Sequence, residues 1–489
     1  MINYITGRVS LIHALPIAGT IRITLAHHEG LRFYLNLYLV QAHARLVRLL
    51  HTSPCPRPAL RQNQTEYGPV RGFKYFNEST LEANWGTPSS GSNVAAFLSI
   101  PFAADTGEDC LTVNIWTGAN SSSDKLPVMI YNQGSDEPSN SAVYYGGGVG
   151  RKGVVAVTFN RRDDVFGYLA HPELNAESEE ENGHSSSDNY GILDFLELLK
   201  WVQRNIENFG GDPDRVTIVG QSFGSAQVYH AVNGGLFKDS YVTMPKALQN
   251  GLNYTASHNA TSISDLRKLS TEEILVGSGD RVTDADIWWV NALSCMYPLK
   301  FKPVLDGYVL PEKYIDSLRK GPPTTSLSSR ATTRMKVGLR RRQTTGLRSI
   351  TSKSFWNAAA RHTSLVSSWL FAKDWAKSAS SPFYMVRTTS PKSFYTMDTL
   401  YANADGHDWT WYDYHVAEIM SSYWVNFVKT GDPNLGGTYL WNNLTYWAPV
   451  GDGKTETVFH VGEGFGEVPL AKHAQVELIT EYFSRQVPY

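Results

Sequence analysis

The stretch Val216-Thr217-Ile218-Val219-Gly220-Gln221-Ser222-Phe223-Gly224-Ser225 governs how the rest of this sequence is interpreted. Residues 216–219 are a short apolar run that predicts a buried strand, and residues 225–232 have the pattern of a helix. Between them, residues 220–224 match G-x-S-x-G. This motif between a strand and a helix is typical of a nucleophile elbow, a tight turn that exposes a serine hydroxyl. We therefore predict that Ser222 is a catalytic nucleophile.

Strand and helix signals alternate in the sequence before this turn. Residues 111–116 alternate apolar and polar side chains, and residues 127–131 and 153–159 are short apolar runs. Residues 189–209 carry apolar side chains at helical spacing. This order predicts an α/β fold with a central, mostly parallel sheet that is flanked by helices. The polar stretch 178–188 is predicted to be an exposed loop within the same series.

Two segments depart from this pattern. Residues 1–64 contain one acidic residue, Glu29, and lack the layout of a signal peptide. We predict that they form an atypical, poorly ordered N-terminal extension without a catalytic role; an organelle-targeting or membrane-surface segment is the alternative. Residues 65–489 are predicted to form the main domain. Within that domain, residues 320–354 are rich in Arg, Thr and Ser, which predicts a loose surface excursion.

The composition excludes several classes of partner. With a net charge of -2 and 18% charged residues, the chain has no strong field that would favour nucleic acid or an anionic membrane. No window of about 18 uncharged apolar residues predicts a stable membrane span. The three cysteines contain no C-x-x-C pair, so they suggest no metal site and permit at most one internal disulfide. Six N-glycosylation sequons mildly favour secretion.

Several blocks resemble one protein family. Residues 209–224 are similar to the serine signature of type-B carboxylesterases, and residues 108–114 to a second signature. Similar blocks follow in family order at 167–174, 301–307 and 423–434. The sequence thus resembles a fungal-type carboxylesterase. The resemblance implies an α/β-hydrolase fold, a serine carboxylic ester hydrolase with a Ser–Glu–His triad, a small-molecule ester substrate, no metal or organic cofactor, and a secreted, lipase-like glycoprotein.

The resemblance also implies an oxyanion site, in which backbone N–H groups bind the charge that develops during acyl transfer. One donor is the N–H of Phe223, and the others belong to a glycine-rich loop after the strand at 127–131. That loop reads Gln133-Gly134-Ser135-Asp136-Glu137, so Gly134 is the predicted donor, and the two acids oppose an anion. The run 146–148, which is all glycine, is interpreted as a flexible turn, with backbone donation to the oxyanion as the alternative.

The expected acid and base are harder to find. The family acid corresponds to residues 337–346, which contain no carboxylate, and the family histidine corresponds to residues 388–392, which contain no histidine. His407 is the nearest candidate base, with a loop histidine as the alternative. His362 and His415 lie on helical patterns and are interpreted as structural or solvated. The catalytic acid is not identifiable from the sequence.

These departures leave three interpretations open. The first is an ester hydrolase, with impaired activity in this chain. The second is a catalytically inactive binding protein with the hydrolase fold. The third is a mis-spliced or mis-predicted product of an active esterase gene, since some family blocks break off while their neighbours match. A transcript that encodes residues 337–346 as they stand would exclude the third interpretation.

Overall fold

The computed structural model describes residues 24–25, 33–34, 111, 113–119, 121–134, 139, 142–221, 223–233, 242–280, 299–312, 334–338, 353–378, 382–388, 392–401, 409–436, 444–450, 455–462 and 464–484. The chain divides into two units, Met1–Ser53 and Pro54–Tyr489. The described part of the first unit is an antiparallel pair of short strands, β1 (Thr24–Leu25) and β2 (Phe33–Tyr34). The predicted boundary at residue 64 stays a prediction, because residues 35–110 lie outside the described residues.

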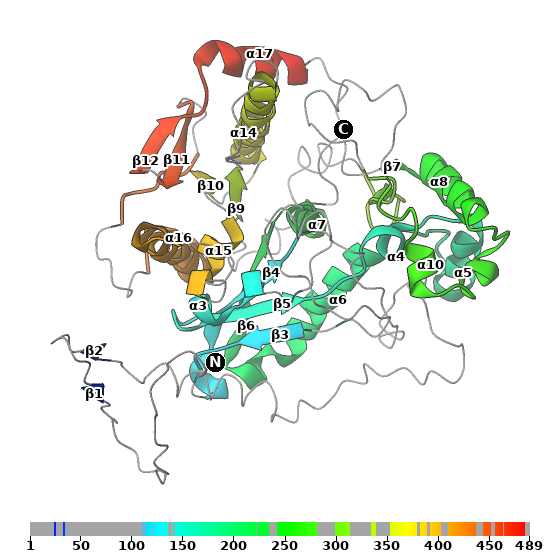
Figure 1. The fold of residues 1–489 in the computed structure, drawn as a ribbon, viewed down its shortest axis with the longest axis horizontal. Helices are drawn as coiled ribbons and strands as arrows, with labels where there is room; N and C mark the ends of the chain where they lie inside the picture. The colour runs from blue at the N-terminus through cyan, green and yellow to red at the C-terminus, as the bar shows by residue number, and fades with distance from the viewer. Residues whose placement is uncertain are drawn as a thin grey trace, which may run out of the picture. The chain divides into compact units, whose positions relative to one another are not determined.

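Four strands of the second unit form the first sheet, in the order β3-β5-β4-β6 (Figure 1). These strands are β3 (Val113–Trp116), β4 (Leu126–Asn132), β5 (Val155–Phe159) and β6 (Gly211–Gly220). β4 pairs in parallel with both β5 and β6, whereas β3 is antiparallel to β5. All of β5, and all of β4 after Leu126, is buried, which accounts for their continuous apolar sequences. The predicted mostly parallel sheet is confirmed.

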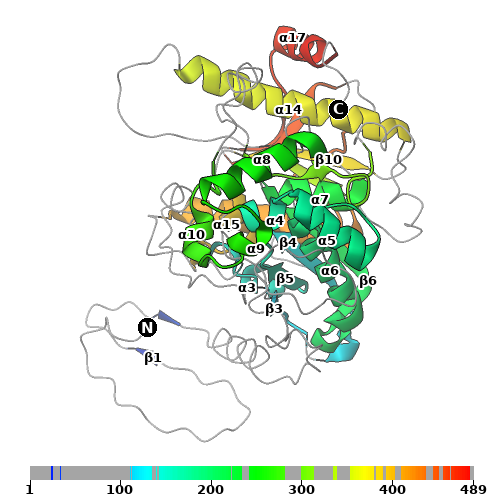
Figure 2. The same cartoon turned by 90° about the vertical axis from the view of Figure 1, so that its right-hand side faces the viewer.

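Two helices flank this sheet and fix the position of the motif. α6 (Tyr190–Asn205) runs alongside it (Figure 2) and is apolar on the side that faces the strands. The α6 side chains in this core are Phe195, Leu198, Trp201 and Val202, and they pack with Ile130, Val155 and Val157 of the strands. α7 (Phe223–Asn233) begins three residues after β6 ends, and it contacts β4, β6 and α6. The predicted strand–turn–helix order is therefore confirmed on both sides of Ser222.

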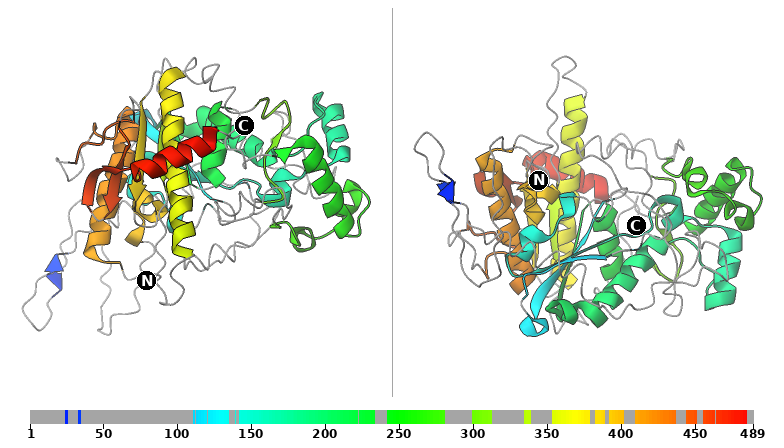
Figure 3. Two further views of the ribbon diagram at one scale, coloured as in Figure 1. Left: turned by 90° about the horizontal axis from the view of Figure 1, so that it is seen from above. Right: turned by 60° about the horizontal axis from the view of Figure 1, so that its bottom comes forward.

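A second four-stranded sheet has the order β12-β11-β10-β9. Its strands are β9 (Arg334–Gly338), β10 (Phe383–Thr388), β11 (Thr457–Gly462) and β12 (Gly464–Pro469). β10 pairs in parallel with β9 and β11, and β12 returns antiparallel to β11. α14 (Lys353–Ser378) covers this sheet and α17 (His473–Ser484) crosses α14 (Figure 3). Val366 and Trp375 of α14 pack with Phe383 and Val458 of the strands.

Shorter elements connect these layers. They are η1 (Ser122–Asp124), η2 (Ala142–Tyr144), α3 (Gly147–Gly150), α4 (Asp164–Tyr168), α5 (Pro172–Asn182), η3 (Ile206–Phe209), β7 (Val242–Thr243), α8 (Met244–Ser257), α9 (Ile263–Leu266), α10 (Thr271–Leu275), β8 (Val304–Leu305), α15 (Lys392–Met397) and α16 (Trp411–Thr430). β7 and β8 form a parallel pair. Phe166, Leu174, Tyr254 and Ile263 form a separate apolar core among α4, α5, α8 and α9. No helix of the described ranges is long and apolar enough to cross a membrane.

The prediction of an exposed loop at 178–188 is confirmed only in part: residues 183–185 form an exposed loop, but residues 178–182 belong to α5 and residues 186–188 are buried. α5 continues to Asn182, and its first turn is capped by Nδ1 of His171, which accepts a hydrogen bond from the N–H of Glu173 at 3.2 Å. Ser187 is also buried, because its hydroxyl accepts a hydrogen bond from the N–H of His171 at 3.0 Å. The polar composition of this stretch suggested exposure to solvent. The side chains of His171 and Ser187 instead form hydrogen bonds with backbone N–H groups inside the fold.

Part of the predicted excursion at 320–354 is regular structure. Arg334–Gly338 forms β9, which pairs along its whole length with β10, and α14 begins at Lys353. The other residues of this stretch lie outside the described residues. This strand was hard to predict, because its residues, Arg-Met-Lys-Val-Gly, alternate polar and apolar side chains over a short length only, inside a basic segment.

Charged side chains tie α3 to the C-terminal helices. Nη2 of Arg151 lies 2.6 Å from the carboxylate of Asp398, and Nζ of Lys152 lies 3.1 Å from that of Glu418 on α16. Burial lowers the pKa of Lys152, and the two neighbouring carboxylates oppose this shift. The Lys152 side chain is fully buried, so the ammonium group must keep these partners to remain charged there.

Candidate active site

The turn between β6 and α7 is the centre of the candidate site. β6 ends at Gly220, and the N–H of Gln221 donates to the backbone oxygen of Asn132 at 3.0 Å, which ties the turn to the end of β4. α7 then begins at Phe223. Ser222 itself lies outside the described residues, but both of its neighbours are placed. The backbone therefore turns from strand to helix within two residues, as the motif predicts.

Both glycines of the motif are required by close packing. A Cβ atom at Gly220 would lie 2.4 Å from the backbone oxygen of Gly224. A Cβ atom at Gly224 would lie 2.2 Å from the backbone oxygen of Asn132 and 2.3 Å from that of Gln133. These separations are far shorter than van der Waals contact, so the turn accepts no side chain at either position. The elbow is thus packed against both itself and the end of β4.

The predicted oxyanion donors lie on two sides of this turn. Phe223 is the first residue of α7, and the first N–H groups of a helix have no partner within the helix and carry partial positive charge. Gly134 is buried two residues after β4. Residues 135–138, which include Asp136 and Glu137, lie outside the described residues. The close packing of Gly224 against Asn132 places the segment that contains Gly134 beside the turn that contains Phe223. The roles of Gly134 and Phe223 as oxyanion donors stay predictions.

The glycine run 146–148 is not a flexible turn. Gly147 and Gly148 belong to α3, and all three glycines are buried. A Cβ atom at Gly148 would lie 2.2 Å from the backbone oxygen of Met397 and 2.4 Å from that of Asp398. Gly148 therefore allows α3 to pack closely against the end of α15. A Cβ atom at Gly146 would instead lie 2.6 Å from the Trp116 ring, so a second close contact also requires glycine.

A polar network that the sequence did not reveal surrounds the turn. Nδ2 of Asn132 donates to Oε1 of Gln227 at 2.9 Å, and Nε2 of Gln227 donates to the hydroxyl of Tyr168 at 2.6 Å. The Tyr168 ring meets the Phe223 ring edge-on at 5.3 Å, and Nη1 of Arg161 donates to Oδ1 of Asn132 at 2.8 Å. The available signal was position, because Asn132 ends one buried strand and Arg161 follows another, at the edge of the sheet that carries the motif.

Burial shifts the ionisation of several groups near this network. It raises the pKa of Tyr168 and of Asp188 well above the ordinary values, because burial disfavours the charged form of each group. Arg162 forms a fully buried ion pair with Asp194, with Nη2 2.7 Å from Oδ1. Burial raises the pKa of Asp194, and the Arg162 guanidinium opposes that rise. These groups support the backbone of the site.

The expected base and acid are not placed by the structure. His407 lies outside the described residues, as do residues 339–350 after β9 and 389–391 after β10. His362 falls on α14 and His415 on α16, as their helical patterns predicted. His415 contacts the rings of Trp411 and Phe465.

One buried histidine near the motif was missed. His230 lies on α7, eight residues after Ser222, and is only 4% exposed. Within the described part of the chain, neither of its ring nitrogens has a hydrogen-bond partner. Burial lowers the pKa of His230 to about 3, so the ring is neutral at pH 7. The position on a short helix after the motif was the sequence signal that could have drawn attention to it.

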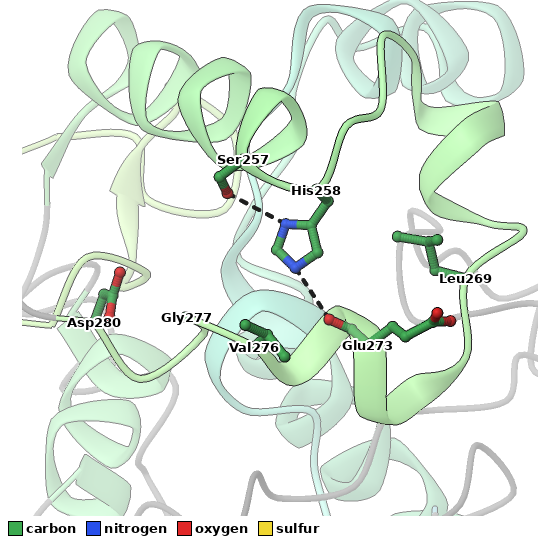
Figure 4. Close-up of a pocket in the computed structure, with 7 residues that line it drawn as sticks. All are labelled: Ser257, His258, Leu269, Glu273, Val276, Gly277 and Asp280. Carbon is green, nitrogen blue, oxygen red and sulfur yellow. Dashed lines mark hydrogen bonds between the residues drawn. The ribbon is translucent and has the colours of Figure 1, made fainter.

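A serine, a histidine and a glutamate meet in a different pocket, of about 450 Å³, beside α8 and α10 (Figure 4). Nε2 of His258 lies 3.0 Å from the backbone oxygen of Glu273, not from its carboxylate. The Glu273 carboxylate instead accepts a hydrogen bond from the N–H of Ser270 at 2.7 Å, and the Ser257 hydroxyl donates to the backbone oxygen of Tyr254 at 2.7 Å. These side chains stabilise helix ends and do not form a triad.

The parallel strands, the flanking helices and the glycine-packed turn after β6 are those of the α/β-hydrolase fold. Comparison with solved structures supports this fold. A PNB esterase superposes with a TM-score of 0.57 at 20% identity, covering 78% of this chain and 87% of that chain. A carboxylesterase of Geobacillus stearothermophilus also gives a TM-score of 0.57 at 20% identity, with the same coverage.

Part of the chain is similar to the carboxylesterases in sequence. The model of the Carboxylesterase family matches residues 104–333, a little under half of the chain. Fumonisin B1 esterase of Sphingopyxis macrogoltabida is 37% identical over 236 residues, 45% of this chain and 41% of that protein. Para-nitrobenzyl esterase of Bacillus subtilis strain 168 is 31% identical over 229 residues, 44% of each. The chain thus spans less than half the length of these two relatives. Bile salt-activated lipase of Rattus norvegicus is 25% identical over 440 residues, 70% of this chain and 68% of that protein.

Proposed function

We propose that this chain is a serine carboxylic ester hydrolase that acts through an acyl-enzyme on Ser222. The observation that carries the proposal is the turn after β6. Gly220 and Gly224 have no room for side chains there, and the chain passes from strand to helix across Ser222. A turn of this kind holds a serine hydroxyl at the edge of a sheet, next to the N-terminus of a helix. The match of residues 104–333 to the Carboxylesterase family model supports the same chemistry.

The proposed reaction has two steps. Oγ of Ser222 attacks the ester carbonyl, and its proton passes to a base, for which His407 is the proposed residue. The carbonyl oxygen becomes an oxyanion, which the N–H of Phe223 and a donor from the loop of Gly134 would bind. When the intermediate collapses, the alcohol leaves with a proton from the base. Water then attacks the acyl-enzyme by the same route and releases the acid. This chemistry needs no metal or organic cofactor.

We propose small carboxylic esters as the substrate class. Several relatives are named as esterases or lipases, with fumonisin B1, para-nitrobenzyl and cocaine esters among the named substrates. Because those names cover chemically different alcohols and acids, they support the ester bond and not one substrate. Secretion and glycosylation stay predictions from the resemblance.

The proposal is tested with the purified full-length chain. We expect p-nitrophenyl butyrate hydrolysis, and covalent labelling by a fluorophosphonate probe at Ser222, identified by peptide mass spectrometry. Ser222→Ala should lose both. The matched control is Ser225→Ala, which removes a hydroxyl three residues further along and should retain labelling and turnover. A folded wild-type chain that neither labels nor turns over would overturn the proposal.

A second candidate function is ligand binding by an inactive hydrolase fold. One observation favours it: β9 and β10 are parallel neighbours, yet the sequence that follows β9 contains no carboxylate before Gly346, and the sequence that follows β10 contains no histidine before Lys392. This candidate predicts a folded protein that binds an ester without cleaving it. Saturable binding of p-nitrophenyl butyrate by calorimetry, with no release of p-nitrophenol, would support this candidate over the first.

A further inference from the structure

Arg161 contacts residues on both sides of the candidate active site. It follows β5 directly after Asn160, and it is only 1% exposed. Nη1 donates to Oδ1 of Asn132 at 2.8 Å, and Nη2 donates to the backbone oxygen of Gly134 at 3.0 Å. The guanidinium carbon also lies 5.6 Å from the centre of the Phe223 ring. One buried side chain thus touches the loop after β4 and the first residue of α7.

The contacts form a closed ring around the turn. Arg161 binds Asn132, and Nδ2 of Asn132 donates to Gln227, which in turn donates to Tyr168. The Tyr168 ring meets the Phe223 ring edge-on, and the Phe223 ring faces Arg161. All of these partners except Phe223 are buried. Each contact therefore restrains the next, although Nε of Arg161 has no hydrogen-bond partner among the described residues.

The geometry requires arginine and not merely a positive charge. The Arg161 guanidinium reaches a side-chain oxygen and a backbone oxygen at once, which its planar, multi-donor group allows and a lysine ammonium does not. Asp163 lies 3.2 Å from Nη2, so the positive charge is already paired. The group acts on the site mainly by holding atoms in place.

Arg162 provides an internal comparison. It is the next residue, it is fully buried, and it also pairs with an aspartate, but its contacts are Asp194 and the Tyr190 ring. Those partners lie on α6 and not on the turn. Two adjacent arginines with the same burial thus support different parts of the fold.

We propose that Arg161 is a positioning residue that holds the backbone at Gly134 and Phe223 in the geometry needed to bind the oxyanion. This inference rests on the proposed ester hydrolysis. Because a peptide unit is planar, holding the Gly134 carbonyl fixes the orientation of the peptide unit that follows Gly134, and this restrains the loop at that point. Holding the Phe223 ring restrains the start of α7. The ester itself is not a partner of Arg161.

The first experiment tests the restraint without any need for catalysis. Hydrogen–deuterium exchange is followed by mass spectrometry in the full-length wild type, Arg161→Lys and Arg161→Gln. We expect faster exchange in peptides that cover 131–134 and 223–227 together, and unchanged exchange in β11. Arg162→Lys is the control and should instead affect peptides from α6. Unchanged exchange at both site segments in the Arg161 variants would overturn the inference.

The second experiment tests the consequence for the reaction. We expect Arg161→Lys to lower kcat for p-nitrophenyl butyrate by about 100-fold, with KM within about twofold of wild type, because misplaced oxyanion donors cost most in the transition state. The affinity for a trifluoromethyl ketone, whose adduct with Ser222 carries an oxyanion, should fall in parallel. Millimolar guanidinium should partly restore kcat in Arg161→Ala and not in Arg162→Ala.

The outcomes separate this inference from the proposed function. A rise in KM with kcat unchanged, or an equal loss in Arg161→Lys and Arg162→Lys, would overturn a positioning role. A wild-type chain that lacks turnover and labelling would overturn the proposed function. The exchange experiment would then show by itself whether Arg161 restrains the two site segments. Should Arg162→Lys not fold, the exposed Arg151→Gln serves as the control.

Discussion

A fully buried ion pair lies beside the first sheet, and an exposed ion pair lies beside the second sheet. Next to the first, Arg162 and Asp194 form an ion pair in which both side chains are fully buried. Beside the second, Lys377 and Asp374 of α14 form an ion pair with side chains 73% and 41% exposed. The difference also concerns function, because the turn with Ser222 follows β6, whereas the expected base and acid follow β10 and β9.

This comparison shows that fold and catalytic completeness depend on different amounts of sequence. A sheet is specified by many apolar positions, and any one of them can vary at a modest cost. A triad depends on three side chains, and the loss of one removes most of the rate. The second sheet can therefore form and pack correctly while the loops after its strands lack the family's carboxylate and histidine.

The largest expected effect tests whether the second half supplies the base. We expect His407→Gln to lower kcat for p-nitrophenyl butyrate by on the order of 10⁴-fold or more, because no group would then take the proton from Ser222. The measurement is the initial rate of p-nitrophenol release at pH 8. His415→Gln is the control, since His415 contacts surface aromatics of α16 and should leave kcat unchanged. A His407 variant with the wild-type rate would assign the base elsewhere.

The next effect concerns the buried and exposed ion pairs. We expect Asp194→Asn to lower the free energy of unfolding by about 3–5 kcal/mol, because it leaves the buried Arg162 guanidinium without a counter-charge. Asp374→Asn, in the exposed pair of α14, should change it by less than about 0.5 kcal/mol. Urea denaturation followed by tryptophan fluorescence measures both. Equal effects in the two variants would contradict the contrast between the two sheets.

Much of the first sheet and of the turn after β6 could be predicted from the sequence, for a physical reason. Buried parallel strands need continuous apolar runs, and the tight turn needs Gly220 and Gly224, so both leave visible patterns. The restraint by Arg161 left no such pattern, because its partners are distant in sequence and one is a backbone oxygen. The strand β9 was missed because its alternation of polar and apolar residues is short and lies within a longer basic segment. The burial of residues 186–188 depends on hydrogen bonds to residues that are distant in sequence, and these cannot be inferred from composition.

A smaller effect tests the buried imidazole of the first half. Burial lowers the pKa of His230 to about 3, whereas an unfolded histidine has a pKa of about 6.5. Below pH 6.5 the unfolded chain binds a proton that the native ring does not, so stability falls as the pH falls. The loss from this group between pH 6.5 and 4.5 should be about 2–3 kcal/mol.

His230→Leu should remove this part of the acid sensitivity and raise stability at pH 4.5, since a buried imidazole without a described partner is costly. Urea denaturation at several pH values measures the slope. His184→Leu is the matched control, because His184 is exposed and the slope should stay as in wild type. An unchanged slope in His230→Leu would show that the ring is protonated or paired in solution.

The smallest effect concerns the exposed imidazole of the second half. Nδ1 of His473, on α17, lies 3.0 Å from the Glu456 carboxylate, and Nε2 lies 3.2 Å from that of Glu477. The hydrogen bond and charge of Glu456, with the charge of Glu477, raise the pKa of His473. A raised pKa means that the stabilisation is present below about pH 6.5 and is lost as the pH rises through the folded-state value.

We expect His473→Gln to lower the melting temperature by about a degree at pH 5.5 and by nothing measurable at pH 9, because solvent screens exposed pairs. Differential scanning fluorimetry at both pH values measures the difference. About 1 M salt should abolish the effect at pH 5.5, since the pair is exposed. An effect as large as that of His230→Leu, or one that grows with pH, would contradict the conclusion that the ion pairs of His473 are weak and exposed to solvent.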